Sequence, residues 1–194
     1  LLRELLAIAQ EKHLKNNLDF SSYSTFFAVS VEKLAELLIT TGRSTEAESL
    51  LRTALDLQKK ALPAEHPSIA RSLNNLAVLL LNTDRSKEAE PLIRNALAMQ
   101  KKMLFAGHPD IAISLSNLAN YLQINGRPTE AEPLLREALV IDRNALPEGS
   151  PIIAILLNNL ATLFSNTGRY EEAEPLYREA LMIAEITKNP ELLW

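Results

Sequence analysis

The chain has 194 residues, of which 47% are hydrophobic and 23% are charged, and its formal net charge is −4. This balance is typical of a globular protein, and the negative charge argues against a nucleic-acid partner, which needs clustered Lys and Arg. The absence of cysteine excludes disulfide bonds and thiolate metal sites. No apolar run reaches the roughly 18 residues of a membrane span, and no signal peptide is visible, so we expect a cytoplasmic protein.

One unit recurs along the chain with a constant step of 42 residues. The triplet Glu-Ala-Glu stands at four positions, which are 46–48, 88–90, 130–132 and 172–174. An arginine just before each triplet keeps the same step, at Arg43, Arg85, Arg127 and Arg169. Such a period indicates an array of one supersecondary unit, in which copies stack because a single copy cannot bury its apolar faces.

The chain divides by this step into one incomplete unit and four further units. Residues 1–23 are predicted to hold a lone helix, because "LLREL" at 1–5 matches "LLREA" at 134–138, followed by a long loop. The four units follow, at residues 24–65, 66–107, 108–149 and 150–194, the last with a truncated end. We predict an all-α fold of about nine antiparallel helices, two from each unit and one from the incomplete unit.

The first half of each unit is predicted to be a helix, called helix A. In the unit at 108–149, apolar residues follow a helical period, at Ala112, Leu115, Leu118, Ala119 and Leu122. A proline opens the helix, where its missing N–H costs nothing, at Pro67, Pro109 and Pro151. A glycine suited to a left-handed turn closes it, at Gly42, Gly126 and Gly168, with Asp84 in this place in one unit.

The second half is predicted to be helix B, starting close to residues 87, 129 and 171. Acidic residues in its first turn suit the positive end of the helix dipole. Pro91, Pro133 and Pro175 should fall near the end of that first turn, because a proline further along would break the helix. Its buried stripe in one unit is predicted to be Ala131, Leu134, Leu135, Ala138 and Leu139.

These residues resemble the tetratricopeptide repeat (TPR). In the last unit the matching positions are Leu157, Leu160, Ala161, Phe164, Gly168, Ala173, Tyr177 and Ala180. The 42-residue spacing, with "NNLA" and "GRYEEAEPLYREAL", looks like the kinesin light chain subfamily and similar bacterial, including cyanobacterial, arrays. The resemblance implies an α-α superhelix, a TPR solenoid, whose A helices line a concave groove that binds peptide or protein segments.

The resemblance places the candidate site on the A-helix positions that face away from helix B. These groove candidates are Arg71, Asn74, Val78, Leu81, Asn82, Ser116, Asn120, Gln123, Asn158, Thr162, Ser165 and Asn166. Asn side chains can donate to and accept from a peptide backbone, and aliphatic positions can take apolar side chains. Only Arg71 is basic, so a clamp for a carboxylate, which needs several cations, is not expected in this array. The alternative interpretation is that the Asn residues serve packing and capping.

Other functions have weaker support in the sequence. The recurring Glu residues at helix starts are better explained by capping than by acid–base catalysis, and no clustered metal ligands or glycine-rich phosphate loop occur. We therefore expect no enzyme activity, no metal and no cofactor. Two alternatives to a peptide-binding scaffold stay open. One is self-association through apolar end faces, such as Leu1, Leu2, Leu5, Ile183 and Ile186; the other is a regulatory repeat tail of a larger NTPase-type protein.

Overall fold

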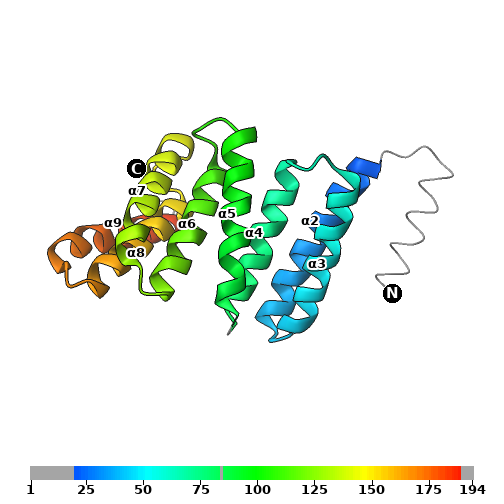
Figure 1. The fold of residues 1–194 in the computed structure, drawn as a ribbon. Helices are drawn as coiled ribbons and strands as arrows, with labels where there is room; N and C mark the ends of the chain where they lie inside the picture. Colours follow the sequence, from blue (N-terminus) through cyan, green and yellow to red (C-terminus); the bar gives the residue numbers. More distant parts are fainter. Residues whose placement is uncertain (1–19, 84, 189–194) are drawn as a thin grey trace.

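The computed structural model describes residues 20–83 and 85–188, and these residues form an all-helical solenoid without strands (Figure 1). Consecutive helices pack in pairs, each pair being one A helix followed by one B helix. The A helices are α2 (Phe20–Thr40), α4 (Pro67–Leu81), α6 (Pro109–Ile124) and α8 (Pro151–Asn166). The B helices are α3 (Ser44–Ala61), α5 (Ser86–Met103), α7 (Pro128–Ala145) and α9 (Tyr170–Lys188).

The four pairs in the described residues confirm the predicted all-α class. The ninth predicted helix, at the start of the chain, lies outside the described residues. Helix α2 begins at Phe20, whereas the first complete unit was predicted to start at residue 24 after a loop through residue 23.

Each later A helix starts with the predicted proline, and the residue before that proline caps the helix. The Nδ1 atoms of His66 and His108 accept hydrogen bonds from the backbone N–H groups of Ser68 and Asp110, at 3.2 and 3.1 Å. The hydroxyl of Ser150 accepts in the same way from Ile152 at 3.4 Å. The two histidines are therefore helix caps in this fold, where each satisfies a backbone donor that the helix leaves free.

In three units the turn between the two helices is made by a glycine with positive φ. Gly126 has φ 71° and donates to the carbonyl of Gln123, while Arg127 donates to the carbonyl of Leu122 at 2.8 Å. This pair of bonds is a Schellman motif, which closes a helix through one left-handed residue. The same bonds recur around Gly42 and Gly168. Asp84, in the equivalent place, lies outside the described residues.

The B helices begin one residue before their predicted starts, at Ser86, Pro128 and Tyr170. As a consequence the inner prolines lie deeper than predicted. Pro91 follows Ser86 by five residues and therefore stands in the second helical turn, where its ring removes one backbone hydrogen bond. The helix continues through this proline as far as Met103, because its apolar face stays packed in the core.

Turn arginines link successive units through ion pairs. Arg127 contacts Glu130 in its own turn at 2.6 Å and Glu90 of the preceding unit at 3.3 Å. Arg169 contacts Glu172 and Glu132 in the same way, and its guanidinium also lies over the ring of Phe164 at 4.0 Å. The repeated arginines therefore serve the turn and the ion pairs between neighbouring units.

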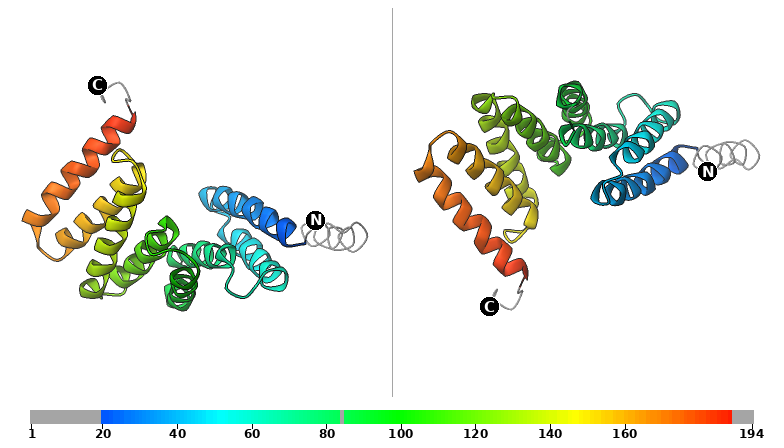
Figure 2. Two further views of the ribbon diagram at one scale, coloured as in Figure 1. Left: turned by 90° about the horizontal axis from the view of Figure 1, so that it is seen from above. Right: turned by 90° about the horizontal axis from the view of Figure 1, so that it is seen from below.

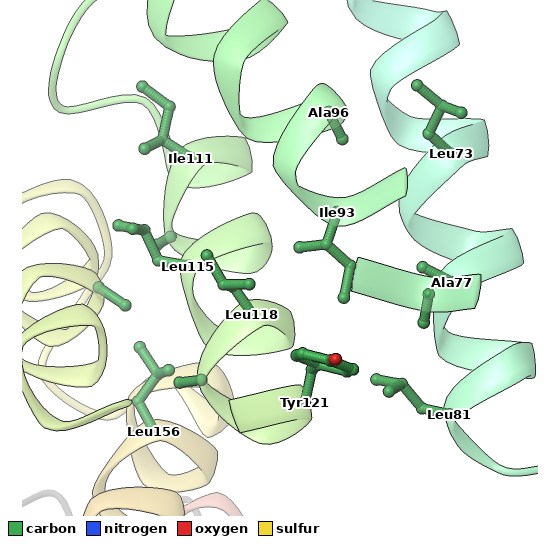
Figure 3. Close-up of a cluster of buried hydrophobic side chains, with 14 of the residues drawn as sticks. Leu73, Ala77, Leu81, Ile93, Ala96, Ile111, Leu115, Leu118, Tyr121 and Leu156 are labelled. Atoms are coloured by element: carbon green, nitrogen blue, oxygen red, sulfur yellow. The ribbon is translucent and has the colours of Figure 1, made fainter. Parts of the chain in front are cut away.

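The core is continuous from one pair to the next. Figure 3 shows Ile93 of α5 between Ala77 of α4 on one side and Leu115 and Leu118 of α6 on the other. Small alanines allow close approach of the helices, and leucines fill the spaces between them. In helix α7, Leu134 of the predicted stripe is only half-buried, whereas its other four members are buried.

The pairs follow one another along a curved path (Figure 2). Each A helix packs on the preceding B helix, and direct contacts also join α2 to α4, α4 to α6 and α6 to α8. The A helices therefore share one side of the array, and their solvent-facing side chains form one surface across the units.

Candidate peptide-binding surface

The A-helix face is defined here by the solvent-accessible residues of α4, α6 and α8 that were predicted to line the groove. Its exposed members are Arg71, Val78, Asn82, Asn120, Asn158 and Asn166. Its half-buried members are Ser116, Gln123, Thr162 and Ser165. The structure thus leaves these ten side chains accessible from solvent. Whether they contact a ligand stays a prediction.

Asn74 was expected to be exposed, and this expectation is wrong. Its side chain is 2% exposed, and its Nδ2 donates a hydrogen bond to the hydroxyl of Ser114 at 2.6 Å. Ser114 belongs to the next A helix, α6, so the contact between α4 and α6 closes over the Asn74 amide. Asn74 is therefore a packing residue.

Leu81 was also expected on the surface and is instead part of the core. It is 8% exposed, and Figure 3 shows it beside Tyr121. The equivalent positions hold Gln123 and Ser165, which are half-buried. This place in the unit lies at the edge of the core, so an aliphatic side chain there turns inward.

Aliphatic residues accompany the amides on the same surface. Ile113, Ile124 and Ile155 are exposed, and they stand at groove places of α6 and α8. Large exposed aliphatic side chains beside Asn120 and Asn158 give the surface both apolar contacts and hydrogen-bonding groups. The combination suits a ligand with an accessible backbone and apolar side chains.

Charge is scarce on this surface. Arg71 lies 3.7 Å from Glu32, and Lys33 pairs with Glu36 at 3.0 Å. Burial raises the pKa of the Glu32 carboxyl, while Arg71 and Ser72 oppose this rise. Helix α8 has no charged residue, and α6 has only Asp110. The described A helices therefore do not present a row of free cations for an acidic ligand.

A trough between α8 and α9 borders the A-helix face. Its volume is about 800 Å³, and its lining includes Ile155, Asn158, Tyr177 and Leu181. Tyr177 is one of the positions that match the repeat pattern, yet it is exposed, and its hydroxyl lies 3.1 Å from that of Thr162. The repeat pattern did not reveal this accessibility, because Tyr177 occupies a position that the core covers in other units.

The end face proposed for self-association differs from the prediction. Ile183 is 5% exposed and Ile186 is half-buried, whereas Leu181 and Met182 are exposed. Ile183 belongs to the buried core, so the exposed apolar side chains of α9 are Leu181 and Met182 instead. Leu1, Leu2 and Leu5 lie outside the described residues.

Two further features bear on function. Among the described residues, no cluster of three or more His, Asp or Glu side chains is arranged to hold a metal ion. In the same part of the chain, no helix is both long and apolar enough to cross a membrane.

Comparison with known proteins gives the same architecture. The sequence profile of the tetratricopeptide repeat matches residues 27–102 and 110–186. A crystal structure of nearly identical TPR-like repeats, described as those of a kinesin light chain of Podosopora anserina, is 29% identical, with TM-score 0.73. The alignment covers 86% of this chain and 77% of that one, and a point variant of the same protein gives 28% identity with the same coverage and TM-score.

A more distant likeness supports the fold alone. BtubC (BKLC) from P. vanneervenii is 22% identical, with TM-score 0.71 over 84% of this chain and 65% of that one. The comparison with curated proteins gave no match. The matched repeats span most of the described helices, and their pairing is that of the solved arrays. The chain therefore belongs to the tetratricopeptide repeat family, with an array of the kinesin light chain type.

Proposed function

We propose that the array is a non-enzymatic scaffold that binds a segment of another protein on the A-helix face. The observation that carries this proposal is the uncharged row of amides and aliphatic side chains, with Asn120 and Asn158 beside Ile113 and Ile155. Amides bind a peptide backbone independently of its sequence, and the isoleucines supply shallow apolar contacts. TPR membership supports a protein partner, since such arrays serve protein interaction.

The partner segment should be apolar rather than acidic. The two basic side chains of the described A helices, Lys33 and Arg71, already lie beside Glu36 and Glu32. A ligand held by free cations would lose affinity steeply with salt, whereas a ligand held by amides and aliphatic contacts would not. We therefore expect affinity to change less than about threefold between 50 and 500 mM NaCl.

The test starts from peptides selected by display against the whole chain, whose affinities are then measured by fluorescence anisotropy. We expect the triple change Ile113→Ala, Asn120→Ala and Asn158→Ala to weaken binding at least about tenfold, since interface residues of this kind each contribute of order 1 kcal/mol. Asn95→Ala with Asn144→Ala is the matched control, because both amides are exposed on B helices. Equal binding by all three proteins would contradict the proposal.

A further inference from the structure

A cavity lies between helix α9 and the loop that joins α7 to α8. Its volume is about 470 Å³, and its apolar lining is made by Ile153, Met182, Ile183 and Ile186. None of these residues belongs to the A-helix face or lines the trough between α8 and α9. The cavity is therefore a separate feature of the surface.

The openness of this cavity does not depend on which helix follows α9. Met182 and Ile186 correspond to Val140 and Asn144 of α7 by the 42-residue step. Val140 is 60% exposed and Asn144 is exposed, although α8 follows α7 and packs on it. A helix that packed on α9 in the same arrangement would leave Met182 and Ile186 accessible as well.

Two units earlier, an ion pair bridges the equivalent loop and helix. The Nζ of Lys102 on α5 donates to the carboxylate of Glu65, in the loop before α4, at 2.6 Å. Two 42-residue steps place Gly149 at the position of Glu65 and Ile186 at that of Lys102. Both of these residues line the cavity. The last unit therefore lacks the lysine that joins loop and helix in the earlier one.

The rim of the cavity keeps a carboxylate without a cation. Glu148 is exposed, lines the cavity and makes no ion pair with another described residue. The other charged groups of the lining, Arg143 and Glu179, pair with each other at 2.6 Å. One cation and two carboxylates give the lining a net charge of −1. The matching occupant is a cation on an apolar stem.

A lysine side chain has this chemistry. Its aliphatic stem can lie on Met182 and Ile186 while its ammonium reaches the carboxylate of Glu148. An anion is disfavoured, because the cation of the lining, Arg143, is already paired. The chain itself places a lysine at the equivalent position, as Lys102.

We propose that the cavity binds a lysine side chain of a partner protein, with an apolar residue of the same segment against Met182 and Ile186. The partner thereby supplies from outside the contact that Lys102 makes within the chain. The inference does not rest on ligand binding at the A-helix face, since the two surfaces share no residue. One such contact is weak, with a dissociation constant on the order of 1 mM, and would act as part of a larger interface.

The probe is the peptide acetyl-Gly-Leu-Lys-Leu-Gly-amide, titrated into the whole chain with ¹³C-labelled isoleucine methyl groups and followed by NMR. We expect saturable shifts of the signals of Ile153, Ile183 and Ile186. The same peptide with norleucine for lysine keeps the stem without the ammonium and should bind about threefold more weakly. Butylamine lacks the apolar neighbours and should also bind more weakly. Butylamine binding as tight as that of the lysine peptide would overturn the inference in favour of a free amine.

Variants test the residues of the cavity. Glu148→Gln should remove the difference between the two peptides, whereas Glu171→Gln, at an exposed carboxylate outside the cavity, should preserve it. Gly149→Glu combined with Ile186→Lys recreates the Glu65–Lys102 pair and should abolish the shifts, because the chain's own lysine then takes the place. Gly149 lacks a positive φ, and a Cβ atom there would meet no neighbour within 4 Å, so the larger side chain fits. Circular dichroism confirms that the variants fold.

Location and salt dependence separate this site from the A-helix face. Binding of the lysine peptide should weaken between 50 and 500 mM NaCl, because salt screens the contact with Glu148, and Ile113→Ala should leave it unchanged. Shifts at Ile113 and Ile124 in place of the cavity isoleucines would overturn the inference. Equal binding of the lysine and norleucine peptides, or unchanged binding by the double variant, would do the same. Dimerisation of the parent chain that the double variant removes would overturn it in favour of a second copy.

Discussion

The hydroxyl of Ser114 on α6 donates a hydrogen bond to Gln100 on α5 and accepts one from Asn74 on α4. All three side chains are buried, with exposures of 2% or less, in a core that is mainly aliphatic. One small hydroxyl thus connects three helices from two successive units. The contact also explains why Asn74 is absent from the surface.

Ser114→Ala should destabilise the array by about 1–3 kcal/mol, because it leaves the Asn74 amide and the Gln100 oxygen buried without their partner. Urea denaturation followed by circular dichroism measures the change. Ser116→Ala is the control: Ser116 is half-buried and accepts one longer bond, from Asn159 at 3.4 Å, so we expect about 0.5 kcal/mol or less. Similar losses in the two variants would argue against the linking role of Ser114.

The buried carboxyl of Asp142 should contribute more to the stability of the fold in acid than at neutral pH. It is 2% exposed, its Oδ1 has no hydrogen-bond partner among the described residues, and burial raises the pKa of its carboxyl. Of the A helices packed against α7, α8 has no charged residue and α6 has only Asp110. Because the folded pKa lies above the unfolded value, stability from this group falls as pH rises through that interval.

Asp142→Asn should therefore raise the melting temperature at pH 7, where the parent buries a charge, and the gain should vanish near about pH 3, below both pKa values. Glutamates with a lowered pKa, such as Glu132 and Glu172, contribute less to the stability of the fold as pH falls. This loss is the same in the parent and in the Asp142→Asn variant. Asp56→Asn, at an exposed site, should leave the melting temperature unchanged both at pH 7 and near about pH 3. A gain that is constant with pH would contradict the assignment to the Asp142 charge.

Gly126→Ala should lower the free energy of unfolding by about 1–2 kcal/mol, because φ is 71° and an L side chain is strained in that conformation. A Cβ atom at Gly126 would meet no neighbour within 4 Å, so the cost is conformational rather than steric. Gly149→Ala offers the comparison, since that glycine also has open space and lacks a positive φ. In thermal melts, Gly126→Ala should have a lower melting temperature than Gly149→Ala. Equal melting temperatures would contradict the conformational explanation.

Arg169→Ala should lower the melting temperature more than Arg127→Ala. Both arginines make equivalent ion pairs, but only the guanidinium of Arg169 stacks on an aromatic ring, at 4.0 Å from the centre of Phe164. Repeating the change in a Phe164→Leu background isolates this contact, because leucine occupies the equivalent place at Leu80 and Leu122. If the loss at Arg169 is the same in both backgrounds, stacking is not its cause.

The pattern of the sequence predicted the scaffold well because the features that determine it are local. Gly126 suits the positive φ of a turn, Pro109 is favoured at a helix start, and the period of Leu115 and Leu118 defines a buried face. Each of these constraints acts within one unit and recurs in the next. The helix pairs, their turns and most of the core therefore followed from the sequence alone.

Accessibility of the candidate site was predicted less well because it depends on the neighbouring unit. Asn74 and Asn158 occupy equivalent places, yet Asn74 is covered by α6 and Asn158 is exposed, with no described A helix following α8. Tyr177 and Leu181 are accessible for the same reason. A repeat pattern gives the position of a residue within its unit, whereas solvent exposure also depends on what is stacked beside it.

The repeated interface also means that the array can change length without a new kind of junction. Deleting residues 66–107 would join Glu65 to His108, which recreates the native Glu-His-Pro sequence at that helix start. It would also bring Ser114 to Gln58, whose amide atoms have no hydrogen-bond partner among the described residues. Gain or loss of whole units by recombination would thus alter the extent of the A-helix face while the contacts between neighbours were retained.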